Sequence, residues 1–251
     1  MKYLALIPAR YASTRFPGKP LADIGGKPMI RRVYEQVKKA VDDVYVATDD
    51  ARIFEAVVSF GGKAVMTSSN HRSGTDRCRE AMEIVGGSFD VVLNIQGDEP
   101  FIQPQQIETL MECFNSSDVD IATLVKPFSE EEGLTALMDA GSPKVVLNKK
   151  MQAIYFSRSV VPYVRDAQCE DWLRKHLFYR HIGLYGYRCN VLREISRLEP
   201  TLLEKAESLE QLRWIENGYV IKAGITHAVS FGIDFPDDIP KALAYMNKHD
   251  L

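Results

Sequence analysis

The chain has 251 residues, of which 45% are hydrophobic and 26% are charged, and its formal net charge is −3 at pH 7. These values exclude a disordered chain, and the small negative charge excludes a general attraction to nucleic acid or to anionic membranes. No apolar run approaches the length of a transmembrane helix, and the run after Met1 is too short for a signal peptide. The cysteines are scattered, with no C-x-x-C pair. The sequence therefore predicts a soluble, reduced, cytoplasmic protein.

The first predicted strand, residues 3–7, leads directly into a cationic loop. The strand is continuously apolar, which is typical of a strand covered on both faces. The loop carries Arg10, Arg15 and Lys19, and its prolines prevent it from forming a helix. Because open α/β sheets bind ligands at the C-terminal ends of their strands, the three cations predict a polyphosphate site. A solvated basic loop is the alternative interpretation.

This loop is not a P-loop, although it contains the Gly18-Lys19 pair. Pro20 stands where a P-loop has the Ser or Thr that binds magnesium, and it prevents a helix from starting directly after the lysine. No Gly-x-Gly-x-x-Gly motif follows the strand either. Any magnesium must therefore be bound by carboxylates elsewhere in the chain.

Strand and helix patterns alternate along the chain as far as residue 125. Further strands are expected at 44–47, 63–66, 90–95 and 121–125, and helices from residue 28 and at 51–60, 74–85 and 104–115. This alternation predicts an α/β fold with a mainly parallel nucleotide-binding sheet flanked by helices.

The pattern changes after residue 127. We expect a hairpin of strands at 144–147 and 152–156, a strand at 181–187, short strands at 220–223 and 228–231, and helices at 189–198, 201–217 and 237–248. We interpret residues 1–251 as a single α/β domain. Residues 127–190 are an excursion from it that forms a lid over a site or a dimer surface.

Two carboxylates follow predicted strands and are candidate magnesium ligands. Asp98 comes directly after the strand at 90–95, behind Gly97, whose missing side chain lets the backbone approach a ligand. Asp234 precedes the last helix and is the better ligand candidate there, since Asp237 is expected to be the N-cap or an acid in the first turn. Magnesium prefers one or two carboxylates together with phosphates and water, so two acids suffice. Capping of the following turn by Asp98 is the alternative.

Seven segments together resemble the sugar-acid cytidylyltransferases, and most closely the members that act on 3-deoxy-D-manno-octulosonate (Kdo). These segments are IPARYASTRFPGKP at 7–20, HRSGTDR at 71–77, QGDEP at 96–100, YFSR at 155–158, RHIGLYGY at 180–187, LEQLR at 209–213 and GIDFP at 232–236. The resemblance runs the full length of the chain. It implies transfer of CMP from CTP to the anomeric hydroxyl of Kdo for lipopolysaccharide synthesis, by a cytoplasmic homodimer that pairs through residues 127–190.

The resemblance also implies roles for individual residues. The catalytic residues would be Arg10, Lys19 and Asp98, and Asp98 and Asp234 would bind Mg²⁺. The nucleotide would contact Arg10, Arg15, Lys19, Ser73, Gly74 and Arg77. The sugar would contact Gln96, Arg158, His181, Tyr185, Glu210 and Gln211, with Arg158 on its carboxylate.

Simpler interpretations remain open for several of these residues. Ser73 is an equally good N-cap for the helix at 74–85. His181 and Tyr185 alternate on one strand face and could be packed core, while Glu210 and Gln211 could lie on an exposed helix face.

Four other functions remain as alternatives to the leading one. Cytidylyltransferases for 8-amino-Kdo or for an acylneuraminate would share the triphosphate loop. A metal-dependent glycosyltransferase is disfavoured, because Asp98 lies in Gln-Gly-Asp and not in Asp-x-Asp. A regulatory module without turnover is disfavoured by the joint presence of Lys19, Asp98 and Asp234.

Overall fold

The computed structural model describes residues 1–228 and 232–249, which divide into two compact units. Unit 1 comprises Met1–Ile107 and Ala228–Leu251, and unit 2 comprises Glu108–His227. The predicted excursion at 127–190 lies inside unit 2, and its role as lid or dimer surface stays a prediction. Within the described ranges, no helix has the length and apolar character needed to cross a membrane.

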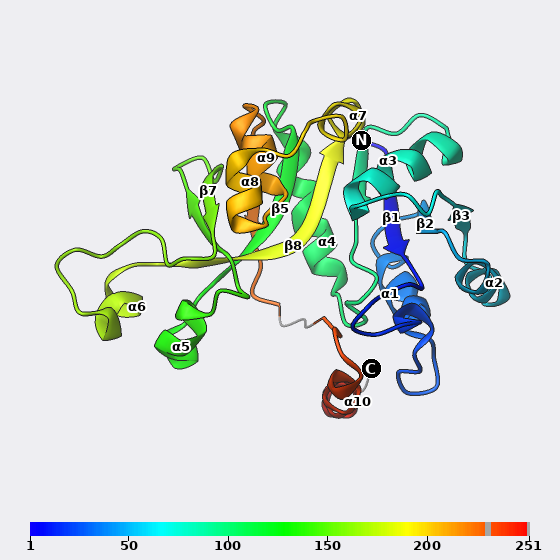
Figure 1. Ribbon diagram of the computed structural model, residues 1–251, viewed down its shortest axis with the longest axis horizontal. Helices are drawn as coiled ribbons and strands as arrows, with labels where there is room; N and C mark the ends of the chain where they lie inside the picture. Colours follow the sequence, from blue (N-terminus) through cyan, green and yellow to red (C-terminus); the bar gives the residue numbers. More distant parts are fainter. Residues whose placement is uncertain (229–231, 250–251) are drawn as a thin grey trace. The chain divides into compact units, whose positions relative to one another are not determined.

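Unit 1 is built on four parallel strands in the order β3-β2-β1-β4 (Figure 1). The side chains from Leu4 to Ile7 on β1 are fully buried, which confirms that this apolar run is a core strand. Because the strands are parallel, the loops after β1, β2 and β4 leave the same edge of the sheet. The strands are β1 (Tyr3–Ala9), β2 (Val44–Thr48), β3 (Ala64–Met66) and β4 (Val91–Asn94).

The helices of unit 1 confirm the predicted alternation. They are α1 (Met29–Val37), α2 (Ala51–Ser59), α3 (Gly74–Val85) and α10 (Ile239–Lys248), with short 3-10 turns η1 (Lys19–Leu21) and η5 (Pro236–Asp238). Helix α3 has the predicted bounds, because Ser73 caps its first turn and Gly86 ends it with a positive φ. Helix α4 (Pro104–Glu112) continues past the end of unit 1. A buried cluster that includes Met29, Ile233 and Ala242 fixes α10.

Unit 2 contains a mixed sheet. Its central strand β5 pairs antiparallel with β8 and parallel with β9, and the predicted hairpin β6–β7 pairs with β8 through β6. Figure 1 shows β8 as the long yellow strand that curves through this unit. The strands are β5 (Ile121–Pro127), β6 (Lys144–Leu147), β7 (Ala153–Ser157), β8 (Tyr179–Arg188) and β9 (Ile221–Ile225).

Short helices surround this mixed sheet. The α-helices are α5 (Gly133–Met138), α6 (Trp172–Lys175), α7 (Cys189–Ile195), α8 (Leu202–Glu207) and α9 (Gln211–Glu216). The 3-10 turns are η2 (Cys113–Asn115), η3 (Glu130–Glu132) and η4 (Cys169–Asp171). The sequence pattern did not predict α5 and α6. They are short and are fixed by a buried cluster of Phe128, Leu137, Trp172 and Phe178, which no local periodicity reveals.

The prediction of one helix over 201–217 is wrong. Ser208 has a left-handed backbone with φ of 52° and separates α8 from α9. The carbonyls of Glu207 and Ser208 accept hydrogen bonds from the Arg158 guanidinium at 2.6 and 3.2 Å, which stabilises the break. The strand expected at 228–231 lies mostly outside the described residues, and Ala228 itself belongs to no strand.

Candidate active site

The cationic loop of unit 1 folds back on itself after β1. The carbonyl of Tyr11 accepts hydrogen bonds from the backbone N–H groups of Ser13 and Gly18, both at 2.9 Å. Gly18 then takes a left-handed φ of 72° and begins η1, in which Pro20 is buried. These contacts fix the direction in which Lys19 leaves the loop.

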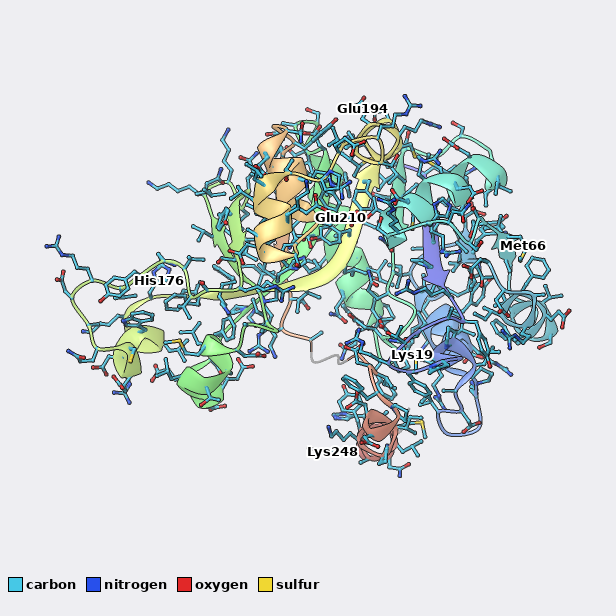
Figure 2. The ribbon with its side chains drawn as sticks, viewed as in Figure 1. Lys19, Met66, His176, Glu194, Glu210 and Lys248 are labelled. Carbon is cyan, nitrogen blue, oxygen red and sulfur yellow. The ribbon has the colours of Figure 1, made fainter. Side chains whose placement is uncertain are left out.

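Lys19 lies between the two predicted magnesium ligands. Its Nζ is 2.7 Å from Asp98 Oδ2 and 3.5 Å from Asp234 Oδ1. Arg15 contacts the same oxygen of Asp234 at 3.1 Å. Figure 2 labels Lys19 beside the segment that leads into α10. The structure thus brings together Arg15, Lys19, Asp98 and Asp234, although the first and the last of them are 219 positions apart in the sequence (234 − 15).

The backbone around Asp98 is held close to β1 and to the segment before α10. A Cβ added to Gly97 would lie 2.9 Å from the Pro8 carbonyl oxygen, so only glycine fits this approach. The carbonyl of Asp98 accepts a hydrogen bond from Ile233 N at 2.9 Å. The neighbouring Asp234 is oriented through its own N–H, which donates to Asp238 Oδ2 at 3.1 Å. Asp238 therefore closes this turn, and Asp237 lies in the first turn of η5, so its N-cap role is wrong and its first-turn role is confirmed.

A hollow of about 250 Å³ opens at this edge of the sheet. All six predicted nucleotide residues line it, together with Gln96 and Asp98. Its lining residues are Pro8, Ala9, Arg10, Ser13, Arg15, Lys19, Pro20, His71, Arg72, Ser73, Gly74, Arg77, Gln96, Gly97 and Asp98. Five of these side chains are Lys or Arg, so the hollow has the electrostatic character of an anion site.

Two of the lining residues at the start of α3, Ser73 and Arg77, already form hydrogen bonds within the protein. Ser73 Oγ accepts from Asp76 N at 3.2 Å, which confirms the capping interpretation. Arg77 is almost completely buried, and it donates to Thr67 Oγ1 at 2.7 Å and to Asp49 Oδ2 at 3.0 Å. Arg77 thus ties α3 to the ends of β2 and β3. Direct nucleotide contact by Ser73, Gly74 or Arg77 stays a prediction.

Arg72 is a lining cation that the sequence interpretation missed. It is exposed, it precedes the N-cap of α3, and no ion pair joins it to the residues of the described ranges. The sequence did contain a sign of this role, since Arg72 lies inside the HRSGTDR segment directly before Ser73. The helix N-terminus and a neighbouring guanidinium both favour a phosphate at this wall.

In unit 2, His181 and Tyr185 lie in an aromatic ladder on β8, where Tyr185 is buried and His181 is half-buried. The His181 ring is 5.2 Å from Phe156 and 5.3 Å from Tyr185, and Tyr185 packs edge-on against Trp214 at 5.2 Å. Burial lowers the pKa of His181 from 6.5 to about 3, so the ring is neutral, with Nε2 at 3.1 Å from Thr123 Oγ1. Burial also raises the pKa of Tyr185 well above its ordinary value.

This ladder contains polar atoms that the described residues do not satisfy. The Tyr185 hydroxyl, the Gln211 amide nitrogen and the Trp214 indole nitrogen are buried and have no hydrogen-bond partner within the described ranges. Gln211 is only 4% exposed, so the alternative of an exposed helix face is wrong for this residue. Glu210, labelled in Figure 2, precedes α9 and is half-buried. Buried unpaired donors of this kind indicate a polar ligand or ordered water.

Arg158 is the predicted partner of the sugar carboxylate, and its guanidinium already donates to three backbone carbonyls in two segments. Nε donates to Glu207 O at 2.6 Å, and the two terminal nitrogens donate to Ala140 O at 2.9 Å and Ser208 O at 3.2 Å. A guanidinium has five N–H groups, so two donors remain beyond these bonds. Carboxylate binding by Arg158 stays a prediction.

The side chain of Glu207, which the sequence interpretation missed, organises the same corner of unit 2. It accepts from Ser157 Oγ at 2.7 Å and from the Arg158 backbone N–H at 2.9 Å. Burial acts to raise the pKa of Glu207, but these hydrogen bonds outweigh it, and the net pKa is lowered. Nothing in the local sequence pattern distinguishes this glutamate, because its partners lie about 50 residues away.

The donor set around Lys19 is compatible with a magnesium ion. Asp98 and Asp234 both reach the Lys19 ammonium, so the two carboxylates converge on this lysine, and Lys19 and Asp98 line the hollow. Carboxylate oxygens are the hard ligands that Mg²⁺ prefers, and phosphates and water usually complete its shell. Metal binding by these two residues stays a prediction.

Comparison with known proteins places this geometry in a family. The cytidylyltransferase family model matches residues 4–224. A protein of Parabacteroides distasonis named 3-deoxy-manno-octulosonate cytidylyltransferase is 61% identical over 247 residues, which cover 98% of each chain. A protein of the same name from Bacteroides thetaiotaomicron is 60% identical over 246 residues, again with 98% of each chain covered.

Solved structures agree with this placement. The structure of CMP:2-keto-3-deoxy-manno-octonic acid synthetase complexed with CTP matches with a TM-score of 0.91 and 42% identity, over 99% of this chain and 100% of that one. A putative glucose-1-phosphate thymidylyltransferase from Bacillus anthracis matches with a TM-score of 0.64 and 17% identity, over 97% and 94% of the two chains, which supports the fold alone. The family model and the relatives together show that this chain belongs to the cytidylyltransferase family, among the 3-deoxy-manno-octulosonate cytidylyltransferases.

Proposed function

We propose that this protein transfers CMP from CTP to the anomeric hydroxyl of Kdo for lipopolysaccharide synthesis. The hydroxyl oxygen forms a bond to the α-phosphorus, the bond from that phosphorus to the bridging oxygen of the β-phosphate breaks, and pyrophosphate leaves while the hydroxyl proton is released. The observation that carries the proposal is the position of Lys19 between Asp98 and Asp234 at a cation-lined hollow. A solved relative with 42% identity is complexed with CTP.

Unit 1 supplies the groups for the triphosphate. Arg10, Arg15 and Lys19 line the hollow and would neutralise phosphate charge. Phosphoryl-type transfer depends mainly on positioning and charge neutralisation. Lys19 would stabilise the charge that develops on the phosphate oxygens in the transition state.

Magnesium is the cofactor we propose. Asp98 and Asp234 would hold the ion, which when bound polarises the phosphate and lowers the pKa of a coordinated hydroxyl. Lys19 contacts both acids, so the same lysine would orient the two carboxylates and bind the triphosphate. One prediction follows directly. Chelation of divalent ions is expected to abolish turnover and added Mg²⁺ to restore it, whereas full activity in excess chelator would exclude the cofactor.

Unit 2 supplies most of the groups for the sugar acid. Tyr185 and Gln211 present buried polar atoms without described partners, and His181 is held neutral beside them. A neutral imidazole and an amide suit hydroxyl groups, which both donate and accept hydrogen bonds. The two remaining donors of Arg158 suit a carboxylate. Glu210 and Gln96 are the further sugar candidates, and Gln96 lies in the hollow of unit 1.

We also propose a cytoplasmic homodimer in which residues 127–190 form the dimer surface and a lid over the sugar. Exposed apolar side chains in this segment support the proposal, among them Tyr163, which is 71% exposed, and Leu177, which is 54% exposed. All four cysteines are free thiols, as in reducing compartments. Light scattering on the purified protein would report the dimer directly.

The test of the proposed function is pyrophosphate release with each of the four nucleoside triphosphates at saturating Mg²⁺. Kdo, 8-amino-Kdo and N-acetylneuraminate serve as acceptors. We expect CTP with Kdo to give the highest kcat/KM. Preference for N-acetylneuraminate or for another nucleotide would overturn the proposal, and preference for 8-amino-Kdo would retain the reaction but change the acceptor.

A further inference from the structure

Helix α2 contacts the cationic loop through a side chain that no part of the proposed chemistry uses. The Arg52 guanidinium lies over the Tyr11 ring, with 3.4 Å between its central carbon and the ring centroid. Arg52 is in the first turn of α2, and its side chain is 58% exposed. An exposed arginine usually samples many rotamers, so a stack this close requires something that holds it.

Asp50 supplies that constraint. Its carboxylate accepts from Arg52 Nε at 3.0 Å and from a terminal guanidinium nitrogen at 2.7 Å, which is a two-pronged contact. The same carboxylate caps α2 by accepting from Arg52 N at 3.0 Å. The guanidinium plane is therefore anchored to the end of β2 and the start of α2, both of which are rigid elements.

Tyr11 connects the fixed guanidinium of Arg52 to the cationic loop. Its carbonyl binds the N–H of Gly18, and its ring lies against Gly18 so closely that an added Cβ would be 3.0 Å from the ring carbon Cζ. Gly18 precedes Lys19 directly and sets the start of η1. A continuous set of contacts thus runs from Asp50 through Arg52, Tyr11 and Gly18 to the lysine that meets Asp98.

We propose that Arg52 is a positioning residue for nucleotide binding, which holds the cationic loop in its binding conformation by stacking on Tyr11. The inference rests on the proposed function of the hollow as the triphosphate site. Arg52 does not line the hollow, so it acts through Tyr11 and Gly18. Without the stack the loop would exchange among conformations, and the affinity for CTP would fall in proportion to the population of the binding conformation.

The test is calorimetric titration of CTP with Mg²⁺ into the full-length protein and its variants. Arg52→Ala is expected to weaken CTP binding about fivefold, the effect of one partly exposed cation–π contact. Arg52→Lys keeps the charge without the planar fork and should recover part of this loss. Tyr11→Ala should weaken binding at least as much, and Tyr11→Phe should restore most of it because the ring remains.

A double variant and a matched control separate positioning from general destabilisation. In the Tyr11→Ala background, Arg52→Ala should cause no further loss, because both changes break the same stack. Arg79→Ala removes another arginine paired on a helix surface, with Glu83 at 2.7 Å, and should leave CTP binding unchanged. The melting temperature of Arg52→Ala should match that of Arg79→Ala.

The outcomes distinguish this inference from the proposed function. Unchanged CTP affinity in Arg52→Ala, or additive losses in the double variant, would overturn the positioning role while transfer to Kdo stands. A wild-type protein that binds CTP but does not form CMP-Kdo would overturn the proposed function, yet the titrations would still test Arg52. Failure of the wild type to bind CTP would overturn both.

Discussion

The candidate nucleotide site of unit 1 and the candidate sugar site of unit 2 are built in opposite ways. In unit 1, charged side chains meet at an open hollow, and the side chain of Asp98 in its wall is 31% exposed. In unit 2, polar atoms of Tyr185 and Gln211 are buried among aromatic rings on β8 and α9. The first arrangement would select a ligand by its charge, and the second by hydrogen bonds in a dry environment.

This difference implies different responses to mutation. A charge removed from an exposed loop changes ligand affinity with little effect on folding, because solvent compensates the loss. A group changed in the buried ladder alters the free energy of unfolding as well as binding, because its neighbours cannot be solvated.

Lys19→Ala is expected to have the largest effect on the reaction. We expect kcat for CMP transfer to fall by about 10²–10³, the range seen when one donor to a transition-state oxyanion is removed. The melting temperature should change less than after a change in the aromatic ladder, because Asp98 and Asp234 are 31% and 47% exposed and water can solvate them. Stopped assays of CMP-Kdo formation at saturating Mg²⁺ measure the effect.

The matched control for Lys19 is Lys38→Ala, which removes an exposed lysine that donates to the Asp42 carbonyl at the end of α1. It should retain wild-type activity. Near-normal turnover in Lys19→Ala would show that the hollow of unit 1 does not work by charge, and the contrast between the two sites would disappear.

The lowered pKa of His181 in unit 2 predicts that the free energy of unfolding depends on pH. The ring is neutral in the fold down to a pKa of about 3, but it takes up a proton near 6.5 when unfolded. The unfolded state therefore binds more protons between these values, and stability falls as the pH drops through this window. At pH 5 this residue should cost about 2 kcal/mol of the free energy of unfolding.

Urea unfolding of the wild type and His181→Gln at pH 7 and pH 5 measures this term. Between pH 7 and pH 5, the free energy of unfolding should fall less in His181→Gln than in the wild type. His176→Gln, which changes an exposed histidine labelled in Figure 2, should show the same fall as the wild type. An identical pH slope in wild type and His181→Gln would mean that the histidine is accessible to protons, and that the ladder is not dry.

Arg158→Ala should raise the KM for Kdo about tenfold, in line with the loss of a charge-assisted hydrogen bond, and leave the KM for CTP unchanged. The variant should also melt earlier, because Ala140 and the α8–α9 break lose their donor. Arg158→Lys separates the two roles, since it keeps a charge but not the fork. A rise in the KM for CTP alone would assign Arg158 to the nucleotide site.

Ser73 gives the smallest effect. Ser73→Ala removes the N-cap of α3 and should cost about 1 kcal/mol of the free energy of unfolding. Ser73→Asp keeps a capping oxygen, so stability should recover, but its negative charge in the hollow should raise the KM for CTP. If Ser73→Asp left the KM unchanged, the triphosphate would not approach the start of α3.

The sequence predicted that charged residues of unit 1 meet at one place, for a physical reason. Charged residues that follow buried strands can be placed at one sheet edge from periodicity alone, and Lys19 and Asp98, which follow β1 and β4, do meet. Asp234 also reaches Lys19, but the strand expected before it lies mostly outside the described residues. Helix α3 was equally accessible, because Ser73 and Gly86 mark its two ends. The choice of cytidine and Kdo came from the family resemblance and not from this geometry.

The parts that the sequence did not reveal depend on contacts between distant segments. The break between α8 and α9 is fixed by Arg158, about 50 residues earlier in the chain. The burial of Gln211 depends on its packing within unit 2, and a helical pattern does not show which face is covered. Arg77 is predicted as a ligand contact, but its hydrogen bonds to Asp49 and Thr67 connect α3 to the ends of β2 and β3. The spacing of residues in the sequence does not indicate such a connection.

The assignment of the nucleotide to unit 1 and of the sugar to unit 2 is tested most directly by titrating CTP with Mg²⁺ into the wild type, Lys19→Ala and Tyr185→Phe. We expect Lys19→Ala to bind CTP at least about tenfold more weakly than the wild type, because a charged hydrogen bond is lost. Tyr185→Phe should bind CTP as the wild type does, since it removes only a buried hydroxyl in unit 2. Equal weakening by the two variants, or weakening by Tyr185→Phe alone, would contradict the assignment of the nucleotide to unit 1.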